Sequence, residues 1–176
     1  IFVQEGLPAA YARHAAASRA VTAGLQGMNL TLYGDQANKM PNVTGVYVPE
    51  GINGDKLRAA LLNDFNIEIG TSFGPLAGKV WRIGAMGYNA RPDCVLQTLA
   101  ALEIVLAAEG HRFSRGAGVD AAYASYQDAR THQRSGPIYS SSFRQTKQAR
   151  TRPSVPSPTA IATTSFRRSI HRERPK

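Results

Sequence analysis

The fold is decided by residues 43–65, which read VTGVYVPEGINGDKLRAALLNDF. The β-branched run of residues 43–48 predicts a strand. Asn53 then suits the N-cap of a helix over residues 54–65. Apolar side chains recur at helical spacing in that segment: Leu57, Leu61 and Phe65. A strand that leads directly into a helix predicts a domain of mixed secondary structure.

The flanking chain predicts further elements of both kinds. Helices are expected at residues 7–26 and 92–108, because a proline stands in the first turn of each. Short strands are expected at residues 30–33, 67–69 and 80–83. The first helix would bury a stripe of five side chains: Leu7, Tyr11, His14, Val21 and Leu25. The order predicts an α+β fold, with a small, mostly antiparallel sheet and helices on one face.

Charge divides the 176-residue chain into two parts. The formal net charge is +9, yet residues 1–129 hold ten basic and eleven acidic side chains, a charge of −1. Residues 130–176 hold eleven basic side chains and one acidic side chain, and 28 of these 47 residues are Ser, Thr, Pro or Arg. Such a segment buries too little apolar surface to offset the entropy of ordering. We therefore expect a folded domain at 1–129 and a disordered basic tail at 130–176.

The tail has two interpretations. It could be an arm for nucleic acid or an anionic membrane, with its densest cluster at Arg167, Arg168, His171, Arg172 and Arg174. It could also be a solvated or out-of-frame extension without a partner. Aromatic residues at stacking spacing are absent from it, so we favour the second interpretation and expect no nucleic-acid partner.

Composition excludes several other classes of protein. No run approaches the roughly 18 apolar residues of a membrane span, so no membrane partner is expected. The single cysteine, Cys94, cannot form an internal disulfide, and the four histidines lack metal-ligand spacing. No signal-peptide pattern is visible, and the expected location is cytoplasmic.

Arg82 is the most informative polar side chain. It lies between Trp81 and Ile83 in an apolar strand, where a guanidinium is costly unless an anion meets it. The anion could be a substrate carboxylate or an internal partner such as Glu68, and the residues alone favour the internal partner. Tyr88 and Asn89 follow the strand and could either line the same site or form a turn before the next helix.

Other candidate chemistry is weak. Gly78-Lys79 lacks both the upstream glycine and the following Ser or Thr of a phosphate loop. Cys94 stands in the predicted first turn of a helix, where the helix dipole can activate a thiol, but a packing role is the simpler interpretation. Residues 1–129 contain no constellation for acid–base or nucleophilic catalysis.

Four segments carry a family resemblance. They are residues 39–54 (KMPNVTGVYVPEGING), 63–70 (NDFNIEIG), 74–84 (GPLAGKVWRIG) and 86–90 (MGYNA). Together they resemble the carboxy-terminal domain of class V aminotransferases, and most closely that of the ureidoglycine–glyoxylate group and the alanine/serine–glyoxylate group. The resemblance covers residues 1–129 and ends where the basic tail begins.

The resemblance implies a homodimeric enzyme of fold type I that depends on pyridoxal phosphate. It would transfer an amino group from a small-molecule donor to a keto acid, namely glyoxylate, with ureidoglycine as the donor expected from purine catabolism. Arg82 takes the position of the arginine that binds the substrate carboxylate.

The resemblance also implies that parts of the enzyme lie outside this chain. The chain has five lysines, namely Lys39, Lys56, Lys79, Lys147 and Lys176. None of them takes the position of the cofactor-binding lysine. We therefore expect a carboxy-terminal fragment that is inactive alone. The alternative is a non-catalytic α+β module that binds an amino acid without a cofactor.

Overall fold

A three-stranded antiparallel sheet forms one layer of the protein in a computed structural model, which describes residues 2–135. The strands are β1 (Val43–Tyr47), β2 (Gly70–Thr71) and β3 (Val80–Gly84), and their order is β1-β3-β2. Arg82 in the central strand stands opposite Gly45 of β1 and Gly70 of β2.

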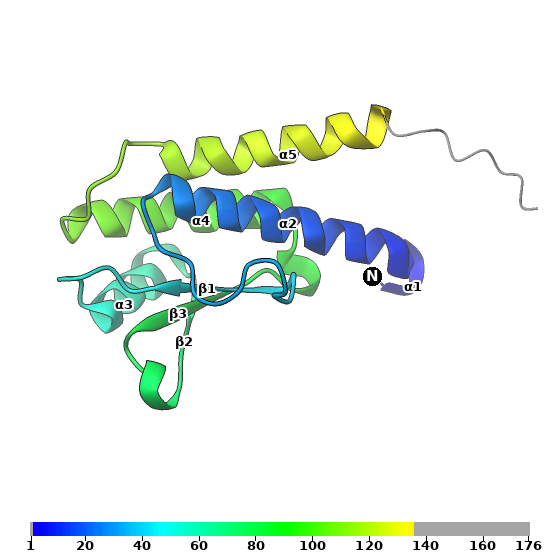
Figure 1. Ribbon diagram of the computed structural model, residues 1–176. Helices are drawn as coiled ribbons and strands as arrows, with labels where there is room; N and C mark the ends of the chain where they lie inside the picture. Colours follow the sequence, from blue (N-terminus) through cyan, green and yellow to red (C-terminus); the bar gives the residue numbers. More distant parts are fainter. Residues whose placement is uncertain (1, 136–176) are drawn as a thin grey trace, which may run out of the picture. The chain divides into compact units, whose positions relative to one another are not determined.

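Helices form the remaining layers (Figure 1). The two helices next to the sheet are α2 (Leu7–Gly27) and α4 (Pro92–Ala108), and α5 (Ala117–Ser135) packs on their far side. The short α1 (Phe2–Glu5) precedes α2, and α3 (Gly54–Phe65) packs against α4. Two 3-10 turns flank β3, namely η1 (Gly74–Leu76) and η2 (Gly87–Asn89). The predicted α+β fold, with an antiparallel sheet and helices on one face, is confirmed.

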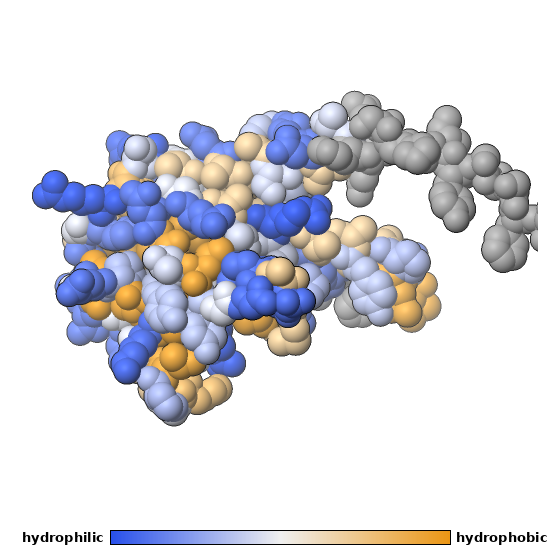
Figure 2. All heavy atoms as spheres, in the orientation of Figure 1, coloured by the Kyte–Doolittle hydropathy of each residue, from blue (hydrophilic) through white to orange (hydrophobic). Residues whose placement is uncertain are grey.

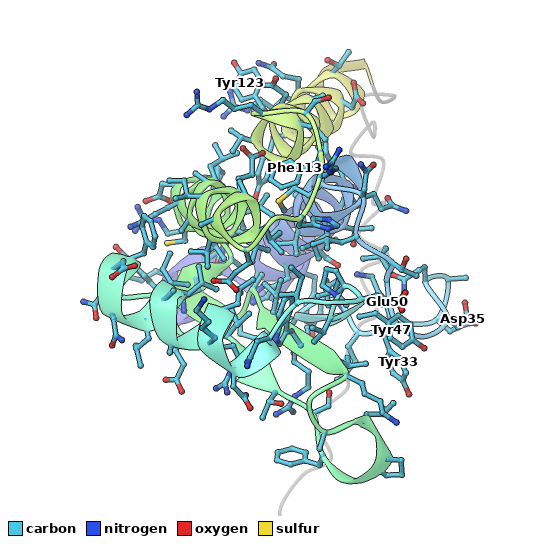
Figure 3. The ribbon with its side chains drawn as sticks, turned by 90° about the vertical axis from the view of Figure 1, so that its left-hand side faces the viewer. Tyr33, Asp35, Tyr47, Glu50, Phe113 and Tyr123 are labelled. Atoms are coloured by element: carbon cyan, nitrogen blue, oxygen red, sulfur yellow. The ribbon has the colours of Figure 1, made fainter. Side chains whose placement is uncertain are left out.

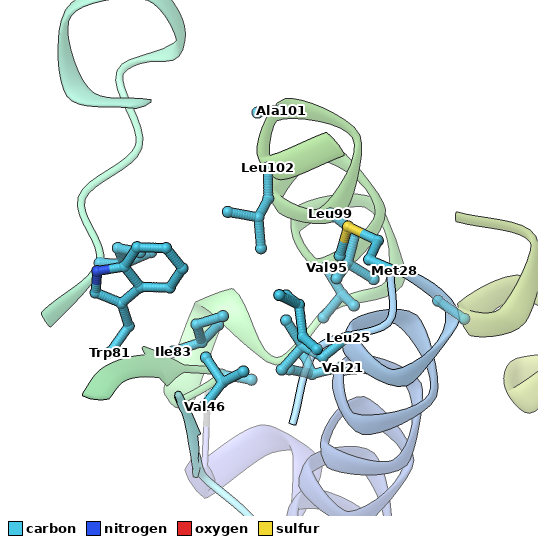
Figure 4. Close-up of a cluster of buried hydrophobic side chains, with 14 of the residues drawn as sticks. Val21, Leu25, Met28, Val46, Trp81, Ile83, Val95, Leu99, Ala101 and Leu102 are labelled. Carbon is cyan, nitrogen blue, oxygen red and sulfur yellow. The ribbon is translucent and has the colours of Figure 1, made fainter. Parts of the chain in front are cut away.

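The hydrophobic core lies between the sheet and the helices (Figure 4). Val46, Trp81 and Ile83 project from the inner face of the sheet and are at most 3% exposed. They pack in one cluster with Leu25 of α2 and Leu99 of α4. Because side chains alternate along a strand, burial of Trp81 and Ile83 directs Arg82 to the opposite, outer face.

Local signals set the ends of α3 as the sequence predicts. The Asn53 side chain accepts a hydrogen bond from the Lys56 backbone N–H at 3.0 Å, which caps the first turn. Asn66 ends the helix in the left-handed conformation with φ of 58°, which asparagine tolerates better than most residues.

Three predicted details are wrong. Residues 30–33 form only an isolated bridge between Leu32 and Val46, and the strand expected at 67–69 lies at Gly70–Thr71 instead. In α2, Leu7 and Tyr11 are exposed, whereas the buried face consists mainly of small residues. Small residues contribute little to a hydrophobic pattern. The larger side chains of Leu7 and Tyr11 therefore dominate the predicted stripe, although they face solvent.

Helix α5 is absent from the sequence prediction. It extends from Ala117 to Ser135 and crosses the expected boundary between residues 129 and 130. Its amino-terminal part lies so close to α2 that a Cβ on Gly27 would stand 2.5 Å from the Ala117 carbonyl oxygen. The rest of the predicted tail, including the cluster at Arg167–Arg174, lies outside the described residues. Within the described part, no helix combines the length and apolar character that crossing a membrane requires.

Candidate functional site

The candidate site is the outer face of the sheet, centred on Arg82. The Arg82 side chain is exposed on this face rather than buried, so the expectation of a guanidinium in an apolar environment is wrong. Glu68, the internal partner considered from sequence, forms no ion pair with it. The Nη1 and Nη2 groups of Arg82 have no hydrogen-bond partner among residues 2–135.

Two contacts fix the guanidinium on the sheet. Arg82 Nε donates to the Thr71 carbonyl oxygen at 2.9 Å. The guanidinium carbon lies 4.7 Å from the centre of the Phe73 ring, within the range of a cation–π contact. Both partners come from the β2–η1 segment, so this hairpin holds the base of the guanidinium while its two outer N–H pairs face solvent.

Glycines on both neighbouring strands let other side chains lie close against the sheet beside Arg82. A Cβ on Gly70 would lie 3.6 Å from Arg82 Nε, and a Cβ on Gly45 would lie 3.2 Å from the Tyr33 ring. A side chain at position 45 would press against Tyr33, whereas a methyl group at position 70 would make an ordinary van der Waals contact with Arg82. The two glycines thus form a low floor beside Arg82, which Tyr33 covers in part, and a planar anion can approach the outer N–H groups from solvent.

Aromatic and sulfur-containing side chains surround this floor. Tyr33 and Tyr47 meet edge to face with ring centres 5.6 Å apart, and Figure 3 shows them side by side. Phe73, which is 74% exposed, lies at the tip of the β2–β3 connection, where Figure 2 shows apolar surface. Met86 reaches back over Gly84, since its Cε lies 3.4 Å from a Cβ built there. The surface can therefore receive a small carboxylate with modest apolar contact.

Tyr88 and Asn89 form the turn before α4, which is one of the two interpretations of the sequence. The Asn89 N–H donates to the Met86 carbonyl oxygen at 2.9 Å within η2. Tyr88 is exposed and its ring lies 4.4 Å from the Arg91 guanidinium carbon. Asn89 lines a cavity of about 370 Å³ that Arg82 does not line. The turn thus separates these two side chains from one another.

The remaining candidates have structural contacts. Cys94 is partly buried in the first turn of α4 and lines the same cavity as Asn89, with no histidine in the lining. His14 Nδ1 lies 2.7 Å from the Ala10 carbonyl oxygen, and His111 Nε2 lies 2.8 Å from that of Met28. Among the described residues, no three His, Cys, Asp or Glu side chains form a group that could hold a metal ion.

Lys39 has an environment that the sequence does not reveal. Its Nζ donates to Thr22 Oγ1 at 2.9 Å and to Thr44 Oγ1 at 3.0 Å. Partial burial lowers the pKa of Lys39 below the usual lysine value. Thr22 lies 17 residues away on another element, so no local pattern could have identified this contact.

The described residues do not fit pyridoxal phosphate. The three lysines in this part are Lys39, bound to two threonines, Lys56, paired with Glu109 at 2.9 Å, and Lys79, which is exposed. The cofactor requires an anion-binding loop for its phosphate and a carboxylate for its pyridine nitrogen. None of these lysines lies beside both. No step of chemistry on that cofactor is derived from these residues.

The α+β domain thus presents an arginine on an exposed sheet face, and such a guanidinium is suited to a small anion. No family model matches the chain. The (S)-ureidoglycine–glyoxylate transaminase of Bacillus subtilis is 46% identical over 129 residues, which cover 73% of this chain and 31% of the transaminase. The crystal structure of the B. subtilis ureidoglycine–glyoxylate aminotransferase superposes with a TM-score of 0.69 and 46% identity, over 71% of this chain and 32% of that one.

A further relative is the alanine–glyoxylate aminotransferase of Felis catus, 34% identical over 107 residues, or 60% of this chain and 26% of the relative. The chain is homologous to class V pyridoxal-phosphate-dependent aminotransferases over most of its described part. It spans between about a quarter and a third of the length of these curated relatives.

Proposed function

We propose that this chain supplies the carboxylate-binding surface of an aminotransferase that passes an amino group to glyoxylate, with ureidoglycine as the amino donor. The observation that carries the proposal is Arg82, whose two outer N–H pairs face solvent on the glycine floor. The 46% identity to a ureidoglycine–glyoxylate transaminase supports the choice of substrates.

The role of Arg82 follows from its geometry. A guanidinium presents parallel N–H donors that match the two oxygens of a carboxylate. Thr71 and Phe73 hold the guanidinium from one side, so little side-chain freedom is lost when the anion binds. Glyoxylate is a small planar anion, so it can reach these outer N–H groups from solvent.

Pyridoxal phosphate would supply the electron sink for amino transfer when bound in a complete enzyme. The described residues offer no site for it, so we propose that this chain without further protein does not transaminate. The same proposal includes a cytoplasmic homodimer, as the family resemblance implies. Sedimentation of the protein that carries this chain would measure its oligomeric state.

The first prediction concerns Arg82. NMR of the Arg82 Nε–H in the 176-residue chain should show a saturable shift with glyoxylate and none with acetamide, a neutral molecule of similar size. Arg82→Met should weaken glyoxylate binding by about 10- to 100-fold, because a hydrogen bond to a charged group contributes roughly 1.5–3 kcal/mol. Arg82→Lys should bind with intermediate affinity, since an ammonium keeps the charge but not the fork.

Arg19→Met is the matched control, because Arg19 is exposed on α2, which packs against the opposite face of the sheet. Equal glyoxylate affinity in the Arg82→Met and Arg19→Met chains would contradict the proposal. A chimeric enzyme tests the same residue by turnover. In it, the matching stretch of this chain replaces the homologous 129-residue stretch of the B. subtilis transaminase. There, Arg82→Met should chiefly raise the KM for glyoxylate.

The similarity to the Felis catus enzyme supports a second amino donor, alanine. Turnover of the chimeric enzyme with ureidoglycine, alanine and serine in turn would decide between the donors. Calorimetry of the chain alone with alanine or serine tests the other alternative, a module that binds an amino acid without a cofactor. Strong binding there would favour that module.

A further inference from the structure

Two neighbouring side chains of α2 hold the backbone of one residue, Gly87, in the turn that follows β3. The Gly87 N–H donates to His14 Nε2 at 2.9 Å, and Arg13 Nη1 donates to the Gly87 carbonyl oxygen at 2.6 Å. The residues lie 73 and 74 positions apart in the chain. Both polar groups of Gly87 are therefore fixed by α2.

Arg13 is itself fixed by α1. Its Nε and Nη2 donate to the two carboxylate oxygens of Glu5, each at 2.7 Å. This paired hydrogen bond lowers the pKa of Glu5 and raises that of Arg13. Both side chains consequently stay charged while a histidine titrates, and Arg13 remains a donor to Gly87.

His14 must be neutral to make its contact. Its Nδ1 lies 2.7 Å from the Ala10 carbonyl oxygen, which can only accept, so the proton stands on Nδ1. Nε2 then carries the lone pair that accepts the Gly87 N–H. Protonation would place an N–H on Nε2 opposite the N–H of Gly87, and two donors cannot form this hydrogen bond.

The turn is linked to the outer face of the sheet through Met86. Gly84 and Arg82 share that face because they are two residues apart on β3. The Met86 side chain reaches over Gly84 in the same direction. Gly87 follows Met86 directly with φ of 55°, a conformation that favours glycine. The held backbone of Gly87 therefore sets where Met86 lies over Gly84, on the face that also carries Arg82.

We propose that Arg13 and His14 are positioning residues of the Arg82 site, which they serve by holding Gly87 and thereby Met86, and that protonation of His14 loosens the site. The inference rests on the proposed role of Arg82. The charged groups near His14 include Glu5 of α1 and Arg13 of α2, while Arg91 and Asp93 at the start of α4 pair with one another. The turn Gly87–Asn89 has no charged side chain.

The test follows four NMR signals of the 176-residue chain against pH. They are the His14 ring nitrogens, the Gly87 amide, the Met86 methyl and the Arg82 Nε–H in the presence of glyoxylate. We expect the Gly87 and Met86 signals to shift with the same midpoint as His14. The glyoxylate affinity at Arg82 should fall by about tenfold over that range, as expected for loss of one hydrogen bond that holds the site. No substitution is needed, so folding of a variant does not limit this measurement.

Variants separate the positioning role from a merely structural one. His14→Gln keeps an acceptor and should bind glyoxylate with an affinity that no longer depends on pH, whereas His14→Phe should bind weakly at every pH. Arg13→Lys should retain more affinity than Arg13→Met. His111→Phe is the matched control, because that half-buried histidine contacts Met28 elsewhere and should leave the pH profile unchanged.

An unchanged glyoxylate affinity through the titration of His14, or in His14→Phe, would overturn the positioning role. So would a Gly87 amide signal that ignores protonation of His14. A chain in which Arg82 never responds to glyoxylate would instead contradict the proposed function, and the Gly87 and Met86 signals would still report whether His14 holds the turn.

Discussion

At the scale of single residues, the exposure of Arg82 decides which kind of partner its guanidinium requires. A buried arginine requires a permanent counterion, whereas an exposed one on a rigid support can exchange its solvent for a ligand. Thr71 and Phe73 provide that support without using the outer N–H groups. The residue is therefore better prepared for a transient anion than for a structural ion pair.

Tyr126 of α5 gives a second prediction at this scale. Its hydroxyl is buried and has no hydrogen-bond partner among the described residues, and burial raises the pKa of Tyr126 to about 12. Removing an unpartnered hydroxyl costs no hydrogen bond, so Tyr126→Phe should raise the free energy of unfolding by up to about 1 kcal/mol at pH 7. Urea unfolding measures the difference, and Tyr123→Phe, at an exposed tyrosine of the same helix, is the control.

The effect of Tyr126 on the pH dependence of the free energy of unfolding has a definite sign. Between pH of about 10, where an unfolded tyrosine loses its proton, and about 12, the folded chain keeps the Tyr126 proton. The folded state then binds more protons than the unfolded state, so this group makes stability fall as pH rises through the window. Tyr126→Phe should lack that part of the decline. A decline of equal size in both chains would show that the hydroxyl is solvated.

The sequence identifies Arg82 but not its surroundings. The glycines beside it, Gly45 and Gly70, become neighbours only through strand pairing. The Gly87 N–H that His14 accepts lies 73 residues from it, and every residue except proline has such a group. Local patterns contain no information on either contact, whereas the family resemblance indicates the arginine directly.

At the scale of elements, the predictable parts are those with strong local signals. The helix over residues 54–65 has a cap and a leucine repeat and lies where expected. Helix α5 and the packing face of α2 depend instead on alanine and glycine, which provide close approach rather than hydrophobic contrast. The two helices come close because large side chains are absent from their contact. A hydrophobic pattern detects large apolar side chains and so does not reveal this contact.

The α2–α5 contact leads to a prediction about Gly27. A Cβ there would lie 2.5 Å from the Ala117 carbonyl oxygen, which is backbone and cannot rotate away. Gly27→Ala should therefore lower the free energy of unfolding by about 1–3 kcal/mol, even though alanine favours helix by roughly 1 kcal/mol.

Gly84→Ala is the control for stability, since the nearest atom to its Cβ is the flexible end of Met86 at 3.4 Å. Urea unfolding of both chains gives the comparison. A Gly27→Ala chain as stable as the unsubstituted chain would mean that the helices do not approach so closely.

At the scale of the whole molecule, stability and charge come from different parts of the chain. The buried apolar side chains of the described residues extend from Ala10 to Ala122. The positive charge comes almost entirely from residues 130–176. The part that holds the Arg82 face is therefore nearly neutral, so attraction of a small carboxylate depends on Arg82 itself rather than on a field from the surrounding domain.

The last prediction concerns a chain that ends after Ser135, where α5 ends. This cut retains every described buried side chain and the whole α2–α5 contact. We expect its thermal midpoint to equal that of the 176-residue chain and its glyoxylate response at Arg82 to be unchanged. A chain that ends after Phe113 lacks α5 and uncovers the faces of α2 and α4 that α5 packs against, so it should unfold. A lower midpoint after the cut at Ser135 would show that residues 136–176 stabilise the domain, contrary to the prediction of a disordered tail from its composition.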